Sequence, residues 1–190
     1  TMSEFTDSVL KLERDSDPEV SDTLNFMKQN VEICVPEKDA RRVAALKGAM
    51  KRLALEYGCS AVAIQCWNSL QDVLHIMPCM SNSLLTDEGI PVVCETDIHG
   101  AITAVIAQAA AMGKTAPFFA DWTVRHPEND NGELLQHCGP WPISLVKEGT
   151  TAKLGRPFAF PEHCPGSVMS EIRGGDMSIL RFDGDHGQYS

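Results

Sequence analysis

Two acidic residues, Glu95 and Asp121, each follow a short apolar run, and their type and placement suit acid/base or metal chemistry. Glu95 comes directly after residues 90–94 (Ile-Pro-Val-Val-Cys), and Asp121 directly after residues 116–120 (Ala-Pro-Phe-Phe-Ala). Paired carboxylates can act as a general acid and a general base, and their oxygens bind hard divalent cations. Two interpretations stay open at this point: either the pair is functional, or Glu95 or Asp97 caps a helix and Asp121 is a turn residue.

The segments around these carboxylates predict a strand, a helix and a second strand. Residues 90–94 and 116–120 have the length and apolar composition of buried strands. Between them, Thr96 or Asp97 is a candidate N-cap and Gly113 a candidate C-terminal glycine. Because this helix is apolar on nearly every side, we expect a buried crossover that joins two parallel strands. Both carboxylates then lie at the carboxyl edge of one sheet, where open α/β sheets bind ligands.

Two more polar residues follow predicted strands and could reach the same cleft. Asn68, next to Trp67, either faces Glu95 or caps the following helix. His137 either joins Glu95 and Asp121 as a metal ligand or has a structural or substrate-contacting role. Carboxylates with one imidazole suit Mn²⁺ or Mg²⁺ better than Zn²⁺ or Cu²⁺. Such an ion would polarise a carbonyl or hydroxyl, which fits isomerisation, aldol cleavage or hydration.

The wider pattern predicts the fold class. Strands and helices alternate over residues 31–121, which indicates an α/β fold with a doubly wound, mostly parallel sheet. After residue 140 helical periodicity vanishes, and residues 168–182 predict a β-hairpin around a tight glycine turn. We therefore expect an α/β metal-site domain over residues 1–140. A smaller, incomplete all-β, barrel-like domain is expected to begin over residues 141–190.

Composition limits the partners and the compartment. The net charge of −10 argues against a nucleic-acid or anionic-membrane partner, because both attract Lys/Arg patches. The seven cysteines include no Cys-x-x-Cys pair, and Cys34, Cys66 and Cys94 lie in apolar runs typical of small hydrophobes. We expect a reducing cytoplasm. The sequence shows no signal peptide, and its most apolar helix is shorter than the roughly 20 residues that span a bilayer.

Five stretches carry a family resemblance. They are residues 63–67 (Ala-Ile-Gln-Cys-Trp), 78–79 (Pro-Cys), 94–103 (Cys-Glu-Thr-Asp-Ile-His-Gly-Ala-Ile-Thr), 119–121 (Phe-Ala-Asp) and 137–139 (His-Cys-Gly). Together, and in this order, they resemble the L-fucose isomerase family, including its relatives that act on D-arabinose and L-arabinose. The Cys-Glu-x-Asp-x-x-Gly-Ala-x-Thr string is the most specific part, and His-Cys-Gly supports it.

The resemblance implies a Mn²⁺-dependent aldose–ketose isomerase that acts on L-fucose, D-arabinose or a similar sugar through a cis-enediol, with Mg²⁺ or Co²⁺ as alternative ions. In that family a Glu and an Asp bind the ion and serve as acid/base groups, and these roles would fall on Glu95 and Asp121. The candidate substrate-binding residues are Trp67, Asn68, Trp122 and His137, with Trp141 as a further candidate for the pocket wall.

One departure from the family concerns the third metal ligand, a His from the C-terminal β domain. We expect that His to lie beyond residue 190, because neither His163 nor His186 lies in a matching motif. The resemblance thus implies the middle of a longer enzyme that forms homo-oligomers, with sites near subunit contacts. The alternatives are a non-catalytic sugar-binding or assembly module of the same fold, and a metal-dependent aldolase that cleaves a carbon–carbon bond.

Overall fold

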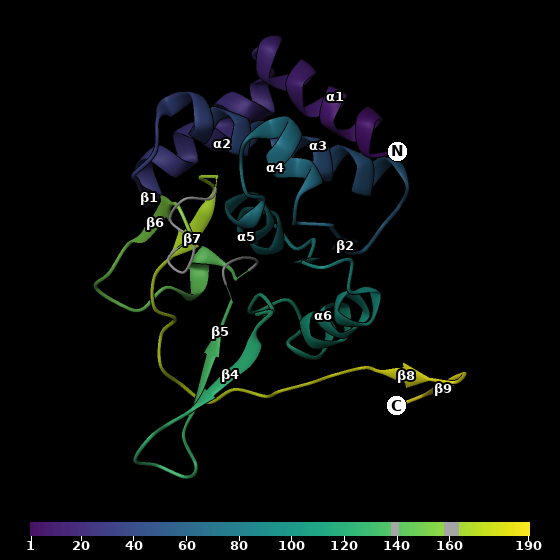
Figure 1. Ribbon diagram of the computed structural model, residues 1–190, viewed down its shortest axis with the longest axis vertical. Coiled ribbons are helices and arrows are strands. Elements are labelled where there is room, and N and C mark those ends of the chain that lie inside the picture. Colours follow the sequence, from purple (N-terminus) through teal and green to yellow (C-terminus); the bar gives the residue numbers. More distant parts are fainter. Residues whose placement is uncertain (138–140, 158–163) are drawn as a thin grey trace.

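The computed structural model describes residues 1–137, 141–157 and 164–190 (Figure 1). Its helices are α1 (Met2–Arg14), α2 (Pro18–Asn30), α3 (Glu37–Glu56), α4 (Ser69–Leu74), α5 (Cys79–Asp87) and α6 (Ile98–Ala110), with a short 3₁₀ turn η1 (Ile143–Leu145). Its strands are β1 (Val31–Ile33), β2 (Val62–Ala63), β3 (Val92–Val93), β4 (Asp121–Arg125), β5 (Glu133–Gln136), β6 (Ala152–Gly155), β7 (Ser167–Met169), β8 (Gly184–Asp185) and β9 (Gln188–Tyr189).

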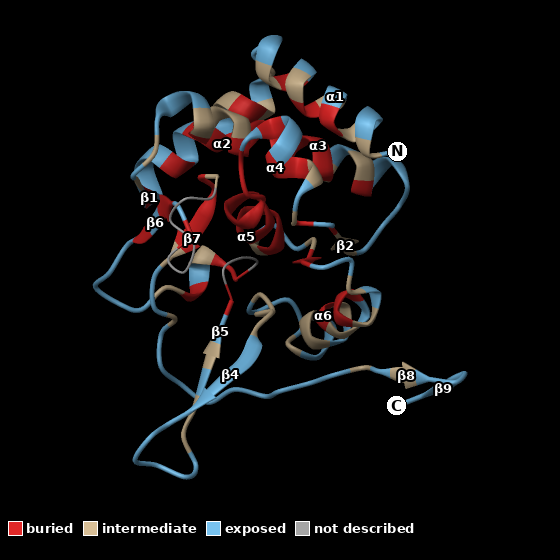
Figure 2. Cartoon of the chain, viewed as in Figure 1, coloured by how far each residue is buried: buried red, intermediate tan, exposed pale blue. Residues whose placement is uncertain are grey.

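Helix α3 is the centre of the hydrophobic core, and α1, α2 and α5 pack around it. Pro36 precedes its first turn with an extended backbone, and Gly58 follows its last turn at a φ of +64°, the left-handed region that glycine tolerates best. Figure 2 shows buried residues concentrated in α3 and α5, whereas the hairpin of β4 and β5 is largely exposed.

A buried lysine joins three of these helices. Lys47 of α3 is 3% exposed, and its ammonium lies 2.6 Å from Glu19 of α2 and pairs with Glu88 at the end of α5. The ammonium also donates to Thr23 of α2 at 3.3 Å. Partial burial alone would raise the pKa of Glu19, but Lys47, with Lys51 beside it, holds that pKa below its usual range. The Glu19 carboxylate is therefore charged and paired at neutral pH.

The strands form separate small sheets, so the predicted doubly wound sheet is not confirmed. Strand β1 pairs in parallel with β6, which pairs antiparallel with β7, whereas β2 and β3 form their own parallel pair. Strands β2 and β3 are two residues long each, and no third strand joins them among the described residues. No barrel closes among the described residues. Strands from both sides of residue 140 share one sheet, and the division of the chain into two domains stays a prediction.

The predicted parallel crossover through α6 is wrong. Residues 116–120 form no strand, and Pro117 within them lacks the N–H that a ladder requires. Strand β4 instead begins at Asp121 and pairs antiparallel with β5.

Helix α6 is also not the buried helix that its composition predicts. Ile98, Ile102 and Ile106 are 39–58% exposed, and the helix packs through Ala101 and Ala104. No helix in the described parts of the chain combines the length and the apolar character needed to cross a membrane.

The predicted hairpin over residues 168–182 is wrong as well. Val168 lies in β7 and pairs with Leu154 of β6, and Ile172 forms a single bridge with Val146. The observed hairpin lies further on, where β8 and β9 pair at the end of the chain (Figure 1). The glycine turn therefore does not join two paired strands, since residues 177–182 form no strand.

The Lys47 ion pairs predict a charge-dependent stability. Replacing Lys47 with Met keeps most of the apolar side chain but removes the buried cation and leaves Glu19 and Glu88 with the more exposed Lys51 alone. We expect a loss of about 2 kcal/mol in the free energy of unfolding at pH 7, below the cost for a fully buried pair because both carboxylates reach solvent. Urea denaturation of the wild type and Lys47→Met measures this loss, with Lys38→Met, an exposed position on the same helix, as the control.

The pH dependence has a defined sign. Because the pKa of Glu19 is lower in the folded protein, its stabilising effect is present above the usual Glu value and is lost as the pH falls through the folded pKa. The difference between the two proteins should shrink below the usual Glu pKa of about 4.3. Equal stability of Lys47→Met and the wild type at pH 7 would contradict this account.

Candidate metal centre

A tight turn after β3 positions Glu95. Glu95 and Thr96 both have a positive φ, 56° and 55°, which costs a non-glycine residue about 1 kcal/mol or more. Two backbone hydrogen bonds hold the turn: Thr96 N–H donates to Ile64 O at 3.1 Å, and Asp97 N–H donates to Cys94 O at 3.1 Å. Asp97 then caps α6 by accepting from Gly100 N–H at 2.8 Å. The turn thus anchors Glu95 between β2 and the start of α6.

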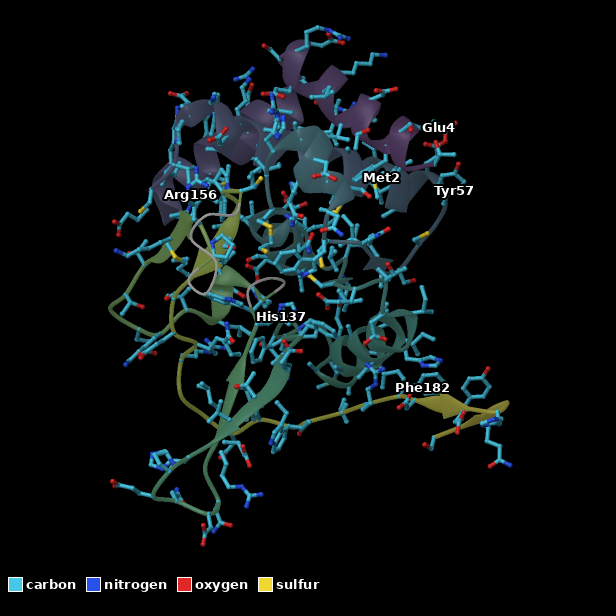
Figure 3. The ribbon with its side chains drawn as sticks, viewed as in Figure 1. Met2, Glu4, Tyr57, His137, Arg156 and Phe182 are labelled. Carbon is cyan, nitrogen blue, oxygen red and sulfur yellow. The ribbon has the colours of Figure 1, made fainter. Side chains whose placement is uncertain are left out.

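His137 lies where both candidate carboxylates meet. Its Nε2 atom is 3.6 Å from Glu95 Oε2 and 3.9 Å from Asp121 Oδ2. The pairing of β4 with β5 sets Asp121 opposite Gln136, which places the next residue, His137, beside Asp121. Figure 3 labels His137 near the centre of the molecule, between the helices and the β4–β5 hairpin. The structure therefore brings together Glu95, Asp121 and His137 from three different segments.

The charge of Glu95 depends on this histidine. The His137 imidazole holds the pKa of the Glu95 carboxyl below its usual range, the Cys66 thiol lowers it further, and partial burial opposes both. The His137 side chain is 3% exposed, whereas those of Glu95 and Asp121 are 48% and 66% exposed. The site thus combines a buried imidazole with two carboxylates that solvent, an ion or a substrate can reach.

The donor types suit a hard divalent cation, but the three ligand atoms do not all lie within 4.8 Å of one another, so the two carboxylates would have to move closer to share one ion. Two carboxylate oxygens within 4 Å of one imidazole nitrogen are ligands that Mn²⁺ or Mg²⁺ accepts, and the exposed sides of Glu95 and Asp121 leave room for water or substrate. His163, one of the weaker candidates for a third ligand, lies outside the described residues, as do Cys138 and Gly139 of the His-Cys-Gly motif.

Two buried thiols on the other side of Glu95 were not part of the predicted site. The Cys66 thiol donates to Glu95 Oε1 at 3.2 Å, and the Cys94 thiol hydrogen-bonds to Cys66. That hydrogen bond lowers the pKa of Cys66, whereas the contact with Cys66, together with burial, raises the pKa of Cys94. A sequence signal exists, since Cys66 follows β2 and Cys94 follows β3, but their apolar surroundings are equally typical of cysteines that act as small hydrophobes.

The predicted substrate-binding residues have different environments. Asn68 occupies the N-cap position of α4, and its backbone N–H donates to Gln71 Oε1 at 2.6 Å, so the alternative of a helix cap is the one that the structure supports. Trp67 before it is half-buried. Trp122 follows Asp121 in β4 and is 61% exposed. Trp141 belongs to the hydrophobic core and is 4% exposed, and its place in a pocket wall stays a prediction.

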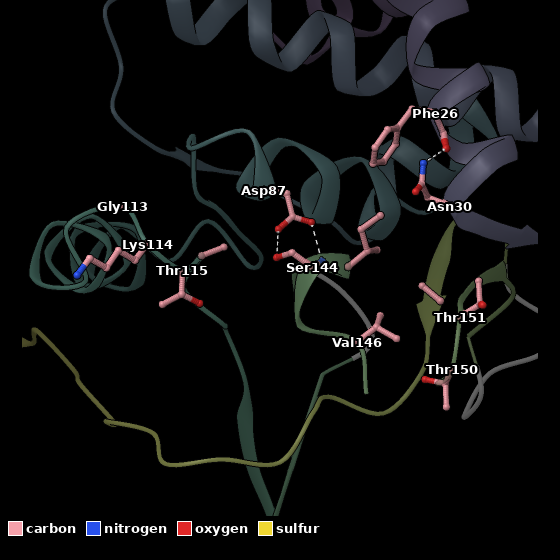
Figure 4. A pocket seen from close by; sticks show the side chains of 13 residues that line it. Phe26, Asn30, Asp87, Gly113, Lys114, Thr115, Ser144, Val146, Thr150 and Thr151 are labelled. Carbon is pink, nitrogen blue, oxygen red and sulfur yellow. Dashed lines mark hydrogen bonds between the residues drawn. The ribbon is translucent and has the colours of Figure 1, made fainter. Parts of the chain in front are cut away.

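A separate pocket of about 470 Å³ lies between α2, the end of α5 and η1 (Figure 4). Asp87 at its edge accepts a hydrogen bond from Ser144 N–H at 3.1 Å and another from the Ser144 hydroxyl, and burial raises the pKa of Asp87. The residues that line this pocket do not include Glu95, Asp121 or His137. Its size alone does not make it the reactive site, because its lining lacks the paired carboxylates.

Comparison with known proteins places the chain among relatives of a sugar isomerase. No protein-family model matches the sequence. A sulfoquinovose isomerase from Alkalicoccus urumqiensis is 31% identical over 155 residues, which cover 81% of this chain and 34% of that relative. Sulfoquinovose isomerases from Priestia aryabhattai and Priestia megaterium are each 33% identical over 122 residues, 64% of this chain and 26% of those relatives.

The chain therefore spans about a third of the length of the first of these curated relatives. The prediction of a sugar isomerase relative is confirmed, whereas membership of the L-fucose isomerase family stays a prediction.

The geometry predicts that both carboxylates are needed for metal binding. We expect Glu95→Gln and Asp121→Asn each to weaken Mn²⁺ binding by at least about tenfold, since removing even an indirect partner of a metal ligand costs that much. Electron paramagnetic resonance of free Mn²⁺ during a titration measures the affinity. Glu128→Gln and Asp130→Asn, at exposed positions in the β4–β5 hairpin, are the matched controls. Unchanged affinity in both site variants would exclude this centre.

The contact with His137 makes a second prediction, testable without metal. Because the imidazole favours the charged form of Glu95, His137→Gln should raise the pKa of that carboxyl toward its usual value. A carbon NMR titration of labelled glutamate in the metal-free protein measures this pKa. His186→Gln, at an exposed position, should leave it where it is. A Glu95 pKa at or above the usual value in the wild type would contradict the observed arrangement.

Proposed function

We propose that the protein is a metal-dependent aldose–ketose isomerase that uses Mn²⁺ and acts on an aldose such as sulfoquinovose, L-fucose or D-arabinose. The observation that supports this proposal most is the meeting of Glu95 and Asp121 at His137, in a chain related to sulfoquinovose isomerases. Mg²⁺ and Co²⁺ are alternative ions, because carboxylate and imidazole ligands accept them as well.

The proposed reaction moves one hydrogen between neighbouring carbons. One carboxylate of the pair removes the proton from C2 of the open-chain aldose, and the resulting cis-enediol takes up a proton at C1. The other carboxylate transfers the hydroxyl proton from O2 to O1, so that the carbonyl ends at C2 and no atom is gained or lost. A bound divalent cation would supply polarisation of the two sugar oxygens.

The environment of Glu95 suits this role. Its lowered pKa keeps the carboxylate ionised at neutral pH, ready to bind a cation or accept a proton. The buried His137 imidazole fixes the direction of Glu95 Oε2, and the open sides of both carboxylates give a sugar access. Trp122, which is 61% exposed, and the half-buried Trp67 are the candidate aromatic side chains for packing on the apolar face of a sugar ring.

The proposal predicts isomerisation that depends on both the metal and Glu95. With Mn²⁺ present, each of the three aldoses is incubated with the protein in deuterium oxide, and NMR follows ketose formation and deuterium uptake at C1. Chelator should abolish the conversion, and Glu95→Gln should lower kcat by about 10²–10⁴-fold, the usual contribution of a general acid or base. Glu128→Gln should retain the wild-type rate.

The other outcomes separate the alternatives. Carbon–carbon cleavage products would indicate an aldolase. Metal-dependent sugar binding without conversion would indicate a binding or assembly module. A conversion rate that neither chelator nor Glu95→Gln changes would exclude the proposed mechanism.

A further inference from the structure

The Glu95 carboxylate has two different neighbours, one on each oxygen. Oε2 lies 3.6 Å from the His137 imidazole, whereas Oε1 accepts a hydrogen bond from the Cys66 thiol at 3.2 Å. One ligand atom from each of Cys66, Cys94 and Glu95 lies within 4.8 Å of the other two. The proposed isomerisation uses neither sulfur. The thiol side of Glu95 is therefore a separate cluster of potential ligands.

The fold holds these thiols together rigidly. Parallel pairing of β2 with β3 and the hydrogen bond from Ile64 N–H to Val93 O at 2.9 Å set the strand ends side by side. Cys66 and Cys94 follow those ends and are only 3% and 1% exposed. Their approach comes from backbone pairing, not from mobile surface loops, so the spacing of the two sulfurs is built into the core.

A polar side chain behind the sulfurs is a second, independent observation. Asn82 of α5 is fully buried, and its Nδ2 lies 3.6 Å from Cys94 Sγ. Its Oδ1 has no hydrogen-bond partner among the described residues. A buried amide that contacts a sulfur and leaves its oxygen unsatisfied is costly in an apolar core. Once a cation has displaced the thiol proton, the Cys94 thiolate would accept a stronger hydrogen bond from this amide than the thiol does.

We propose that Cys66 Sγ, Cys94 Sγ and Glu95 Oε1 form a binding site for a thiophilic divalent cation of the zinc class. Around tetrahedral zinc, with bonds of about 2.3 Å to sulfur and about 2.0 Å to oxygen, neighbouring ligands lie roughly 3.5–3.8 Å apart. The observed spacing approaches this value with small side-chain movements. Binding forms two zinc–sulfur bonds and releases the two thiol protons to solvent, with no change of oxidation state. The exposed side of Glu95 leaves a fourth position for water.

The two sites on Glu95 would select ions by softness. The thiol side favours Zn²⁺ or Cd²⁺, and the imidazole side with Asp121 favours Mn²⁺ or Mg²⁺. Because one carboxylate serves both, zinc on the thiols would draw Glu95 away from the hard-cation centre. This consequence, inhibition of isomerisation by zinc, rests on the proposed function, whereas the binding site itself does not.

Cadmium titration tests the site directly. Cd²⁺ bound to thiolates gives a charge-transfer absorbance in the ultraviolet, and the protein used carries Cys34→Ser and Cys59→Ser to remove two exposed thiols. We expect one equivalent of Cd²⁺ to produce the band and Zn²⁺ to displace it. Cys66→Ser should weaken Cd²⁺ binding at least about tenfold. Cys164→Ser is the control and should keep the band.

A second measurement leaves Cys66 and Cys94 intact, so its result does not depend on whether a cluster variant folds. Cadmium NMR of the Cys34→Ser/Cys59→Ser protein reports the number of sulfur ligands, and two are expected. The absence of any tight Cd²⁺ band, a single sulfur ligand, or loss of the band in Cys164→Ser would each overturn the assignment. A thermal melt of Cys66→Ser shows whether lost binding reflects the missing ligand or an unfolded protein.

The inhibitory consequence has its own readout. The ratio of isomerisation rates with and without Zn²⁺ is compared between the wild type and Cys66→Ser, each saturated with Mn²⁺. Relief of inhibition in Cys66→Ser supports a thiol-side ion, and equal inhibition places the zinc at the hard-cation centre. A positive cadmium band without any isomerase activity would leave the thiol site standing and count against the proposed function alone.

Discussion

The left-handed turn at Glu95 and Thr96 is the constraint on which the candidate centre depends. Two consecutive non-glycine residues with positive φ are unfavourable, and the hydrogen bonds from Thr96 to Ile64 and from Asp97 to Cys94 offset that cost. With the turn fixed, Asp97 caps α6 and Glu95 projects between His137 and Cys66. Backbone strain at a residue flanked by an imidazole and a thiol is typical of functional sites, where the surrounding structure holds a side chain in one direction.

The hydrophobic core around α3 and the candidate metal centre have different physical roles. Helix α3 joins α2 and the end of α5 through ion pairs that its buried Lys47 and the neighbouring Lys51 make with Glu19 and Glu88. Helix α5 also contacts the thiol pair, since its Asn82 lies against Cys94. The β4–β5 hairpin, which carries Asp121, is exposed by comparison. One carboxylate of the pair is thus anchored in the core, and the other comes from a more solvated element.

The sequence predicted local features better than long-range pairing. The strand before Glu95, the cap at Asp97 and the helix after Pro36 follow from short-range chemistry, and the structure has all three. The sheet order did not follow, because β1 pairs with β6, which lies far along the chain, and no local pattern encodes such a partner. The strand predicted over residues 116–120 does not form, and Pro117 within it lacks the backbone N–H that a strand ladder needs. Yet Asp121 still lies beside His137, which contacts Glu95, because the pairing of β4 with β5 places Asp121 and His137 next to each other.

The two oxygens of Glu95 explain why spacing alone could identify this residue but not its full chemistry. A carboxylate that follows a strand is visible in the sequence, whereas the identity of its neighbours depends on pairing between β2 and β3 and between β4 and β5. Those pairings place an imidazole on one oxygen and a thiol on the other. Hard and soft ligands therefore share a single anionic group. Since the anion can fully serve only one cation, the ratio of the two metals around the protein would set the state of the centre.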